Sequence, residues 1–148
     1  MKKLGWIIFG LIVLAFASVI GEMVGETVSD SIFGNAQQPE LTDKMVAQIA
    51  SEINSLLPMK VDSGTRLNNV SGTRKRFTYY YTLLNYASSD IDSEIFVKEM
   101  RDNLKNSVCS NPNIETFLEN GVSIRYMYSG NNSSYIADIT VEPSECGY

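Results

Sequence analysis

Apolar residues recur at helical spacing in three stretches of the chain, and each stretch carries its own end signals. The first runs over residues 41–57 and ends at Pro58, which disfavours a helical residue before it. The second begins after Asp92, whose side chain suits a helix N-cap, and ends at Cys109. The third is short, with a proline at its first helical position and Gly121 after its end. The apolar positions of the first stretch are Leu41, Met45, Ile49, Ile53, Leu56 and Leu57. The predicted core-facing residues of the other two are Phe96, Met100, Leu104 and Val108, then Ile114, Phe117 and Leu118.

Residues 77–86 are the clearest strand, because aromatic and β-branched residues dominate them. We expect Phe77, Tyr79 and Tyr81 to face inward, with Thr78 and Tyr80 on the opposite face. Since both faces carry apolar or aromatic side chains, this strand is predicted to lie in the middle of a sheet.

Four further extended segments surround it. Residues 59–62 and 65–70 precede it, with a Ser-Gly turn between them. Residues 122–128 and 135–141 alternate in polarity on both sides of a Ser-Gly-Asn-Asn turn, the pattern of a β-hairpin. The predicted inward residues of this hairpin are Val122, Ile124, Tyr126, Tyr128, Tyr135, Ala137, Ile139 and Val141.

This order of elements predicts an α+β fold: an antiparallel sheet of about four to five strands with helices packed on one face. We assign residues 1–29 to a membrane anchor or signal peptide with a juxtamembrane helix, residues 30–39 to a linker, and residues 40–148 to one extracytoplasmic domain.

The N-terminal apolar run, residues 4–20, would span about 25 Å as a helix, near the lower limit for a bilayer. We favour a single-pass anchor in the bacterial inner membrane, because small residues continue the helical period beyond the apolar run. Lys2 and Lys3 would then lie inside and the rest of the chain in the periplasm. The alternative is a signal peptide cleaved after Ala17, which would release a secreted or periplasmic chain beginning at Ser18.

Small residues recur every four positions at Ala17, Gly21, Gly25 and Ser29. Such a stripe lets two helix backbones approach closely, so it is a candidate helix-packing surface and a route to a homo-oligomer. The other interpretation is a juxtamembrane linker loosened by glycine and serine.

Cys109 and Cys146 are the only cysteines, and the N-terminal segment places them outside the cytoplasm. We therefore predict a disulfide between them. In the chain-entropy model, a bond closing a loop of this length contributes roughly 3 to 4 kcal/mol.

Composition excludes several function classes. The chain of 148 residues has no histidine, so it has no Ser-His-Asp or Cys-His triad and no histidine-bearing zinc motif. Two cysteines cannot form a four-cysteine metal site, and no pair of carboxylates is placed for acid–base catalysis. A formal net charge of −5 argues against nucleic acid as a partner. We predict no metal, no cofactor and no catalytic residue.

Two groups of residues are candidates for binding a partner. Arg74, Lys75 and Arg76 could grip an acidic partner or a lipid phosphate, or form a solvated turn. Tyr80 and Tyr86 lie on the face expected to point outward, where aromatic rings suit protein contacts.

The elements follow one another in a recognisable layout: Leu56-Leu57-Pro58 closes a helix, a tyrosine-rich strand follows, Cys109 ends a helix, and a Tyr126-x-Tyr128 hairpin leads to Cys146. This layout resembles the small periplasmic pilotin-type domains of type II secretion, and also a broader set of uncharacterised membrane-anchored bacterial proteins. The resemblance covers residues 41–146 and implies an α/β fold with one helix-to-strand disulfide. Typical pilotins are lipoproteins, whereas this chain has no lipidation cysteine, so no functional residue is carried over.

These observations favour a non-enzymatic domain that binds another envelope protein through a helix groove or an exposed sheet edge. A secreted inhibitor or immunity-type protein is the first alternative, and an enzyme of unknown type is the second.

Overall fold

A computed structural model describes residues 40–148, and the predictions for the anchor, the small-residue stripe and the linker fall outside this part. Within it, no helix has both the length and the apolar character to cross a bilayer. The elements, with η for a 3₁₀-helix, are α2 (Asp43–Asn54), β1 (Met59–Lys60), β2 (Thr65–Thr73), β3 (Arg76–Leu83), η1 (Ser88–Asp90), α3 (Ser93–Cys109), α4 (Pro112–Glu119), β4 (Ser123–Gly130), β5 (Tyr135–Val141) and η2 (Pro143–Cys146).

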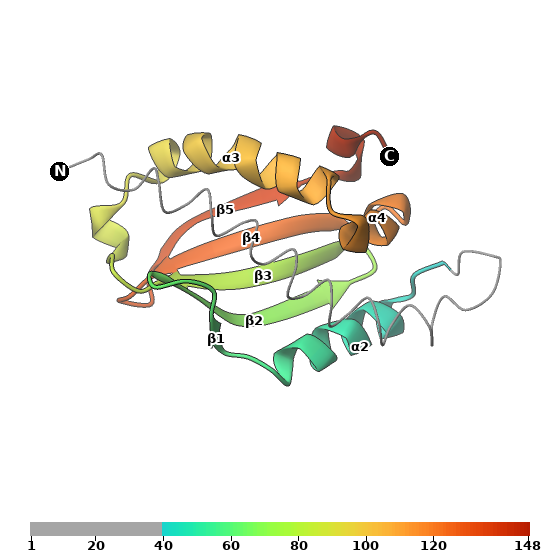
Figure 1. Cartoon of the computed structure of the whole chain (residues 1–148), viewed down its shortest axis with the longest axis horizontal. Helices are drawn as coiled ribbons and strands as arrows, with labels where there is room; N and C mark the ends of the chain where they lie inside the picture. The colour runs from blue at the N-terminus through green and yellow to red at the C-terminus, as the bar shows by residue number, and fades with distance from the viewer. Residues whose placement is uncertain (1–39) are drawn as a thin grey trace.

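The five strands form one sheet in the order β1-β2-β3-β4-β5 (Figure 1). Neighbouring strands are antiparallel except β3 and β4, which run parallel. The prediction of a purely antiparallel sheet is therefore wrong at its centre. The reason is the connection: α3 and α4 carry the chain back to the end of the sheet where β3 began, as a parallel pair requires.

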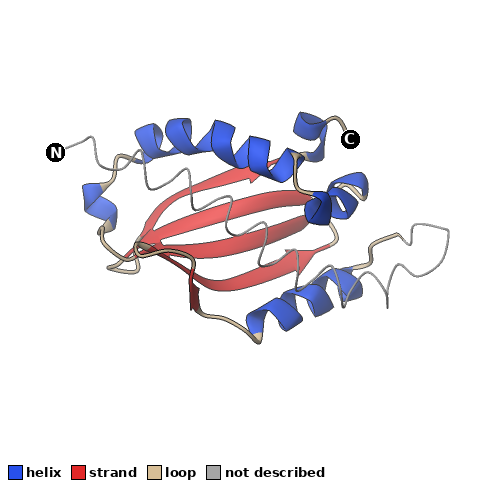
Figure 2. Cartoon of the chain, in the orientation of Figure 1, coloured by secondary structure: helices blue, strands red, loops and turns tan. Residues whose placement is uncertain are grey.

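The three α-helices pack on one face of the sheet, as predicted. In Figure 2, α2 follows the β2 side and α3 follows the β5 side. Phe96 of α3 contacts Tyr128 with ring centroids 5.0 Å apart, and Phe117 of α4 contacts Phe77 at 5.4 Å. Both sheet residues belong to the face predicted to point inward.

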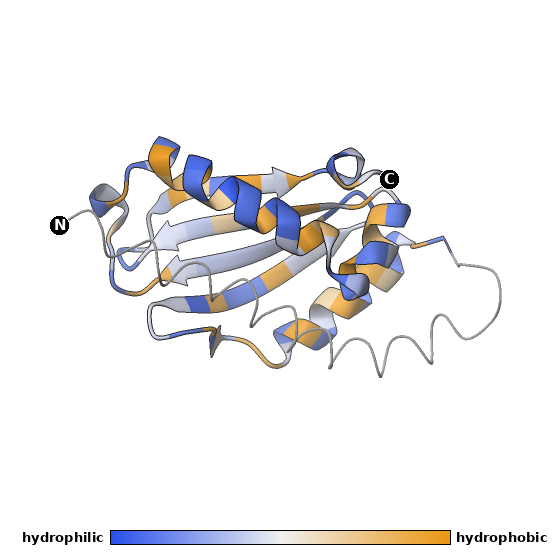
Figure 3. Ribbon diagram, turned by 45° about the horizontal axis from the view of Figure 1, so that its top comes forward, coloured by the Kyte–Doolittle hydropathy of each residue, from blue (hydrophilic) through white to orange (hydrophobic). Residues whose placement is uncertain are grey.

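The inner face of the sheet is the set of strand side chains on this helix-covered side. Its buried members are Leu67, Val70, Phe77, Tyr79, Tyr81, Leu83, Ile124, Tyr126, Tyr128, Ala137, Ile139 and Val141. The parallel register sets like residues beside each other: Tyr79 stacks on Tyr126 and Tyr81 on Tyr128, with centroids 5.3 and 5.4 Å apart. The centre of the sheet is pale in Figure 3 because tyrosine, threonine and serine form much of it.

The end signals in the sequence act largely as predicted. Asp92 caps α3 by accepting hydrogen bonds from the backbone N–H groups of Glu94 and Ile95. The proline opens α4, and Gly121 adopts φ 76° after its end. The first helix is shorter than predicted, because Thr42 is its N-cap and Asn54 its last residue.

One inward prediction fails in the hairpin. The pairing between β4 and β5 shifts by one residue at Tyr128 and Ser129, as at a β-bulge. Tyr135 is consequently 58% exposed, and Ile136 is buried in its place.

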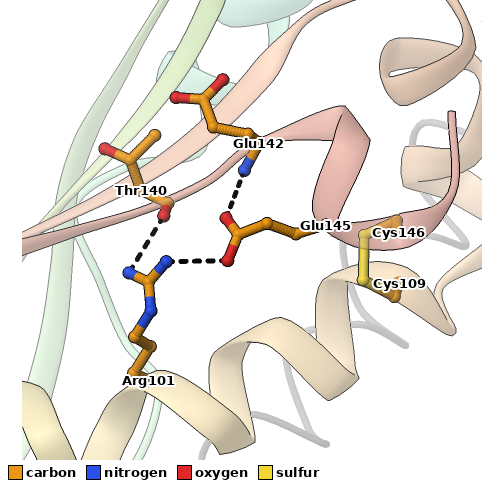
Figure 4. A network of polar contacts seen from close by, with 6 residues as sticks. All are labelled: Arg101, Cys109, Thr140, Glu142, Glu145 and Cys146. Atoms are coloured by element: carbon orange, nitrogen blue, oxygen red, sulfur yellow. Dashed lines mark hydrogen bonds and ion pairs between the residues drawn. A yellow bond between two sulfur atoms is a disulfide. The ribbon is translucent and has the colours of Figure 1, made fainter.

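The predicted disulfide is present between Cys109 at the end of α3 and Cys146 in η2, with Cα atoms 5.1 Å apart (Figure 4). Beside it, the Arg101 guanidinium donates to a Glu145 carboxylate oxygen at 2.7 Å and to the Thr140 carbonyl at 3.5 Å. Glu145 also accepts from the Glu142 backbone N–H, and this hydrogen bond is the main reason that its pKa is lowered. The C-terminus is thus tied to α3 by one covalent bond and one ion pair.

Candidate binding surface on the polar face of the sheet

The side chains that point away from the helices form a second, polar face of the same strands. We call this set the outer face: Lys60, Arg66, Asn68, Asn69, Ser71, Arg76, Thr78, Tyr80, Thr82, Arg125, Met127, Asp138 and Thr140. Most of them follow from the two-residue period of strands whose other residues are inward. Asn68 and Asn69 are consecutive because the pairing of β2 with β3 shifts between Leu67 and Asn69, as at a β-bulge. The three α-helices of residues 40–148 all pack on the opposite side.

Charge is unevenly divided between this face and the rest of the described domain. Residues 40–148 hold ten basic and fourteen acidic side chains. The outer face carries four of the ten, Lys60, Arg66, Arg76 and Arg125, but only one of the fourteen, Asp138. It therefore has a formal surplus of three positive charges, in a chain whose net charge is −5.

The single carboxylate of this face already has partners. Arg125 Nε donates to Asp138 Oδ2 at 2.9 Å, and the Tyr135 hydroxyl donates to Asp138 Oδ1 at 2.5 Å. The hydrogen bond from Arg125 is the largest of the causes that lower the pKa of Asp138, followed by the one from Tyr135, and Arg76 adds a charge effect. Asp138 is thus ionised at neutral pH and engaged by Arg125 rather than by the other basic residues.

At the other end of the face, hydrogen bonds to neutral groups hold Arg66. Its Nε donates to Asn68 Oδ1 at 2.8 Å, and the Asn68 amide donates to the Thr82 hydroxyl at 2.7 Å. This arrangement orients the guanidinium stem without neutralising its charge.

Between the two ends lies a less polar centre. Tyr80 is paired in register with Met127 on β4, and its hydroxyl lies 3.1 Å from the Ser71 hydroxyl. Both Tyr80 and Met127 are half-buried within the outer face.

The five residues predicted to bind a partner are distributed over different places. Arg76 and Tyr80 lie on the outer face. Arg74 turns towards α2, where its backbone N–H donates to Asp43 at 2.6 Å and its guanidinium lies 3.7 Å from Glu40. Lys75 is exposed in the β2–β3 turn, and Tyr86 is exposed beyond the end of β3.

Sequence reasoning missed Lys60, Arg66 and Arg125 as members of one surface. A usable signal existed for the hairpin, because Arg125 alternates with inward-facing Ile124 and Tyr126. That these residues gather with Arg76 depends on the strand order, which no local pattern contains.

Exposed sheet edges, which the sequence analysis considered for binding, are partly covered by side chains. The Asn54 amide donates to the Val70 carbonyl and accepts from the Val70 N–H, both at 2.8 Å, and so replaces a neighbouring strand. At the other edge, Arg101 donates to the Thr140 carbonyl. Natural sheets often protect their edges in such ways.

A groove of about 460 Å³ lies between the start of α3 and the start of β5. Its lining residues are Ser93, Glu94, Val97, Lys98, Tyr135, Ile136, Ala137 and Asp138. Besides the outer face, this groove is a second surface at which a polypeptide could dock.

The four tyrosines of the inner face are buried in the core. Burial raises the pKa of Tyr79, Tyr81, Tyr126 and Tyr128 above that of an exposed tyrosine, so all four phenols are neutral at physiological pH. Among residues 40–148, no three acidic or cysteine side chains are grouped so that they could hold a metal ion.

A family model described as a domain of unknown function, DUF8479, matches residues 40–136. The chain belongs to this family. The matched range takes in the whole sheet up to the start of β5, and so includes most of both faces.

A curated relative, Protein K of Escherichia coli, is 36% identical over 62 residues, which are 42% of this chain. The match spans about one third of the length of that relative.

Three solved structures share the fold. A candidate secreted protein of Pseudomonas aeruginosa superposes with a TM-score of 0.60 at 18% identity, covering 76% of this chain and 99% of the other. The type II secretion pilotin EpsS of Vibrio vulnificus gives 0.56 at 13%, covering 72% and 92%. The pilotin AspS of Vibrio cholerae gives 0.52 at 17%, covering 70% and 91%. The pilotin-like fold implied by the sequence resemblance is confirmed.

Proposed function

We propose that this chain is a non-enzymatic domain of the bacterial envelope that binds another envelope protein. The observation that carries the proposal is the pilotin-like fold, shared with two proteins of a secretion system. The disulfide is consistent with this location, since such bonds persist in the periplasm and outside the cell.

In this proposal residues 4–20 anchor the chain in the inner membrane and its folded domain lies in the periplasm. The outer face, which includes Arg76 and Tyr80, is the partner-binding surface. This surface is broad and polar and has a formal surplus of positive charge. A protein partner would cover it more completely than a small ligand would.

Site-specific photo-crosslinking in native cells tests this function. The full-length chain carries a photoreactive residue in place of Tyr80, of Tyr86 or of Ile95, the last being 53% exposed on α3. A discrete crosslinked adduct at Tyr80, and none at Ile95, is the expected result. If none of these positions, nor Val97 in the groove beside β5, gives an adduct, the chain is not a protein-binding domain.

The alternative of a cleaved, secreted inhibitor-type protein has one observation in its favour, the candidate secreted protein of Pseudomonas aeruginosa with the same fold. Intact mass of the native protein separates the two. A full-length chain in membranes supports the anchor, and a soluble product beginning at Ser18 supports secretion.

A further inference from the structure

We propose that the outer face binds an acidic, extended polypeptide segment of the partner. This inference rests on the proposed function and adds the chemistry of the partner. It follows from where the positive charges lie, what neutralises them, and which side chains lie between them.

The basic residues of the outer face lie in two pairs. Lys60 and Arg66 are register partners on β1 and β2. Arg76 is paired with Ser123, so it lies diagonally next to Arg125 on β4, within reach of a long side chain. Arg66 pairs with Thr82, six residues along β3 from Arg76, which places the two pairs about 20 Å apart.

Charge complementarity decides the sign of the partner. The outer face has four basic residues against Asp138, whose charge Arg125 already engages. The remaining surfaces of residues 40–148, including the β2–β3 turn, carry six basic and thirteen acidic side chains. An acidic segment is thus attracted to the outer face and repelled from the rest of the domain, which fixes where it docks.

The centre of the face suits a polypeptide. Tyr80 and Met127 offer an aromatic and an apolar contact between the two basic pairs, and Ser71 and Thr82 add hydroxyl groups. A partner segment with carboxylates about 20 Å apart and an apolar residue between them matches this pattern. Fully extended, about six residues cover that distance.

A lipid surface fits less well. The large aromatic and apolar side chains of the outer face, Tyr80 and Met127, are half-buried and offer little surface that could enter a bilayer. Of the most exposed large hydrophobic side chains in the described domain, Tyr135 borders this face with its hydroxyl bonded to Asp138, and the others lie elsewhere: Leu56, Tyr86, Ile95 and Tyr148. The basic side chains are also too few and too far apart to act as a polybasic cluster.

Binding of a labelled peptide tests the proposal. The probe carries a glutamate pair at each end, about 20 Å apart when extended, and a phenylalanine between them. The control probe has glutamine in place of each glutamate. Fluorescence anisotropy is measured with the full-length chain in neutral detergent micelles.

A pair of double variants provides the matched comparison. Arg66→Glu with Arg76→Glu reverses one charge at each end of the outer face. Lys44→Glu with Lys105→Glu makes the same change on α2 and α3, outside both the outer face and the groove beside β5. The outer-face variant should weaken binding of the acidic probe by about tenfold or more, and the helix variant by about twofold or less. The glutamine probe should bind the wild-type chain at least about tenfold more weakly.

Three results would overturn the inference. The first is equal weakening of binding by both double variants, and the second is equal binding of the two probes. The third is that neither probe binds, while the chain sediments with phosphatidylglycerol vesicles in a way that depends on Arg66 and Arg76. The last would assign the face to lipid headgroups. Should the reversed variant fail to reach the wild-type denaturation midpoint, Arg66→Gln with Arg76→Gln replaces it, with an expected loss of about threefold.

Crosslinking in cells separates failure of this inference from failure of the proposed function. If both hold, the Tyr80 adduct disappears in the Arg66→Glu, Arg76→Glu background and persists in the Lys44→Glu, Lys105→Glu background. If the adduct persists in both, the chain binds a protein but the partner is not acidic. Absence of an adduct at every surface position rejects the proposed function itself.

Discussion

The two faces of the central strands β3 and β4 are built from alternating residues of the same segments, yet their environments differ. On the inner face, four tyrosines are stacked and buried against helices. On the outer face, Tyr80 sits among hydroxyl, amide and basic side chains. Tyrosine is therefore a core residue at one position and a surface residue at the next. Residue type alone does not distinguish a tyrosine that packs in the core from one on the surface. The difference depends on which face of the sheet the helices cover.

Adjacent tyrosines provide the sharpest way to break this comparison. Tyr79→Ala removes an aromatic ring from the buried stack and should lower the free energy of unfolding by about 3 to 5 kcal/mol. Tyr80→Ala is the matched control on the outer face and should cost about 1 kcal/mol or less. Urea denaturation measures both, and equal losses would show that the two faces are packed alike.

Loss of the disulfide is expected to have the next largest effect on stability, because this bond holds the C-terminal segment against the end of α3. Replacing Cys109 and Cys146 together by serine should lower stability by roughly 2 to 5 kcal/mol under oxidising conditions. Wild-type protein in reductant should lose a similar amount, and the serine variant should not respond to reductant. Identical midpoints for variant and oxidised wild type would refute the prediction.

The edge contact of Asn54 tests whether a side chain substitutes for a strand. Asn54→Ala leaves the Val70 N–H and carbonyl without their partner and should cost about 1 to 2 kcal/mol. Gln48→Ala removes an exposed hydrogen bond to Glu52 and should change stability by less than about 0.5 kcal/mol. Amide hydrogen exchange at Val70 adds a local readout: it should speed up only in the first variant.

The smallest effect concerns the one carboxylate of the outer face. Because the pKa of Asp138 is lowered in the folded state from its usual 3.8, its contribution to stability is present above that value. The contribution is lost as pH falls through the lower, folded-state pKa. Asp138→Asn should cost about 0.5 to 1 kcal/mol at pH 7 and should flatten the dependence of stability on pH below about 4. A variant that keeps the full acid-side slope would assign that slope to other carboxylates.

Much of the domain could be predicted from local patterns. Asp92 lies directly before apolar residues at helical spacing, and its side chain accepts hydrogen bonds from the first backbone N–H groups of the helix. Phe77 and the tyrosines at alternate positions indicate a strand with one face buried, since strand side chains have a period of two. The outcome at Tyr135 shows the limit, because a bulge shifts the register and alternation alone does not reveal it.

The candidate site was harder to predict from the sequence than the fold. The sequence contains the run from Arg74 to Arg76, but only Arg76 reaches the outer face, because the turn directs Arg74 towards Asp43 and Glu40. Arg66 and Arg125 lie outside that run, and each looks like an isolated surface charge in the sequence.

The sequence by itself determined the three helices, the cap of α3, the inward side of β3 and the identity of the disulfide pair. Each of these depends on neighbouring residues or, for the disulfide, on there being two cysteines. The tertiary structure decided that β3 and β4 run parallel, and hence that Arg125 lies beside Arg76 on the outer face. Strand pairing depends on where the α3–α4 connection returns the chain, and that is settled by packing of the whole domain rather than by any local pattern.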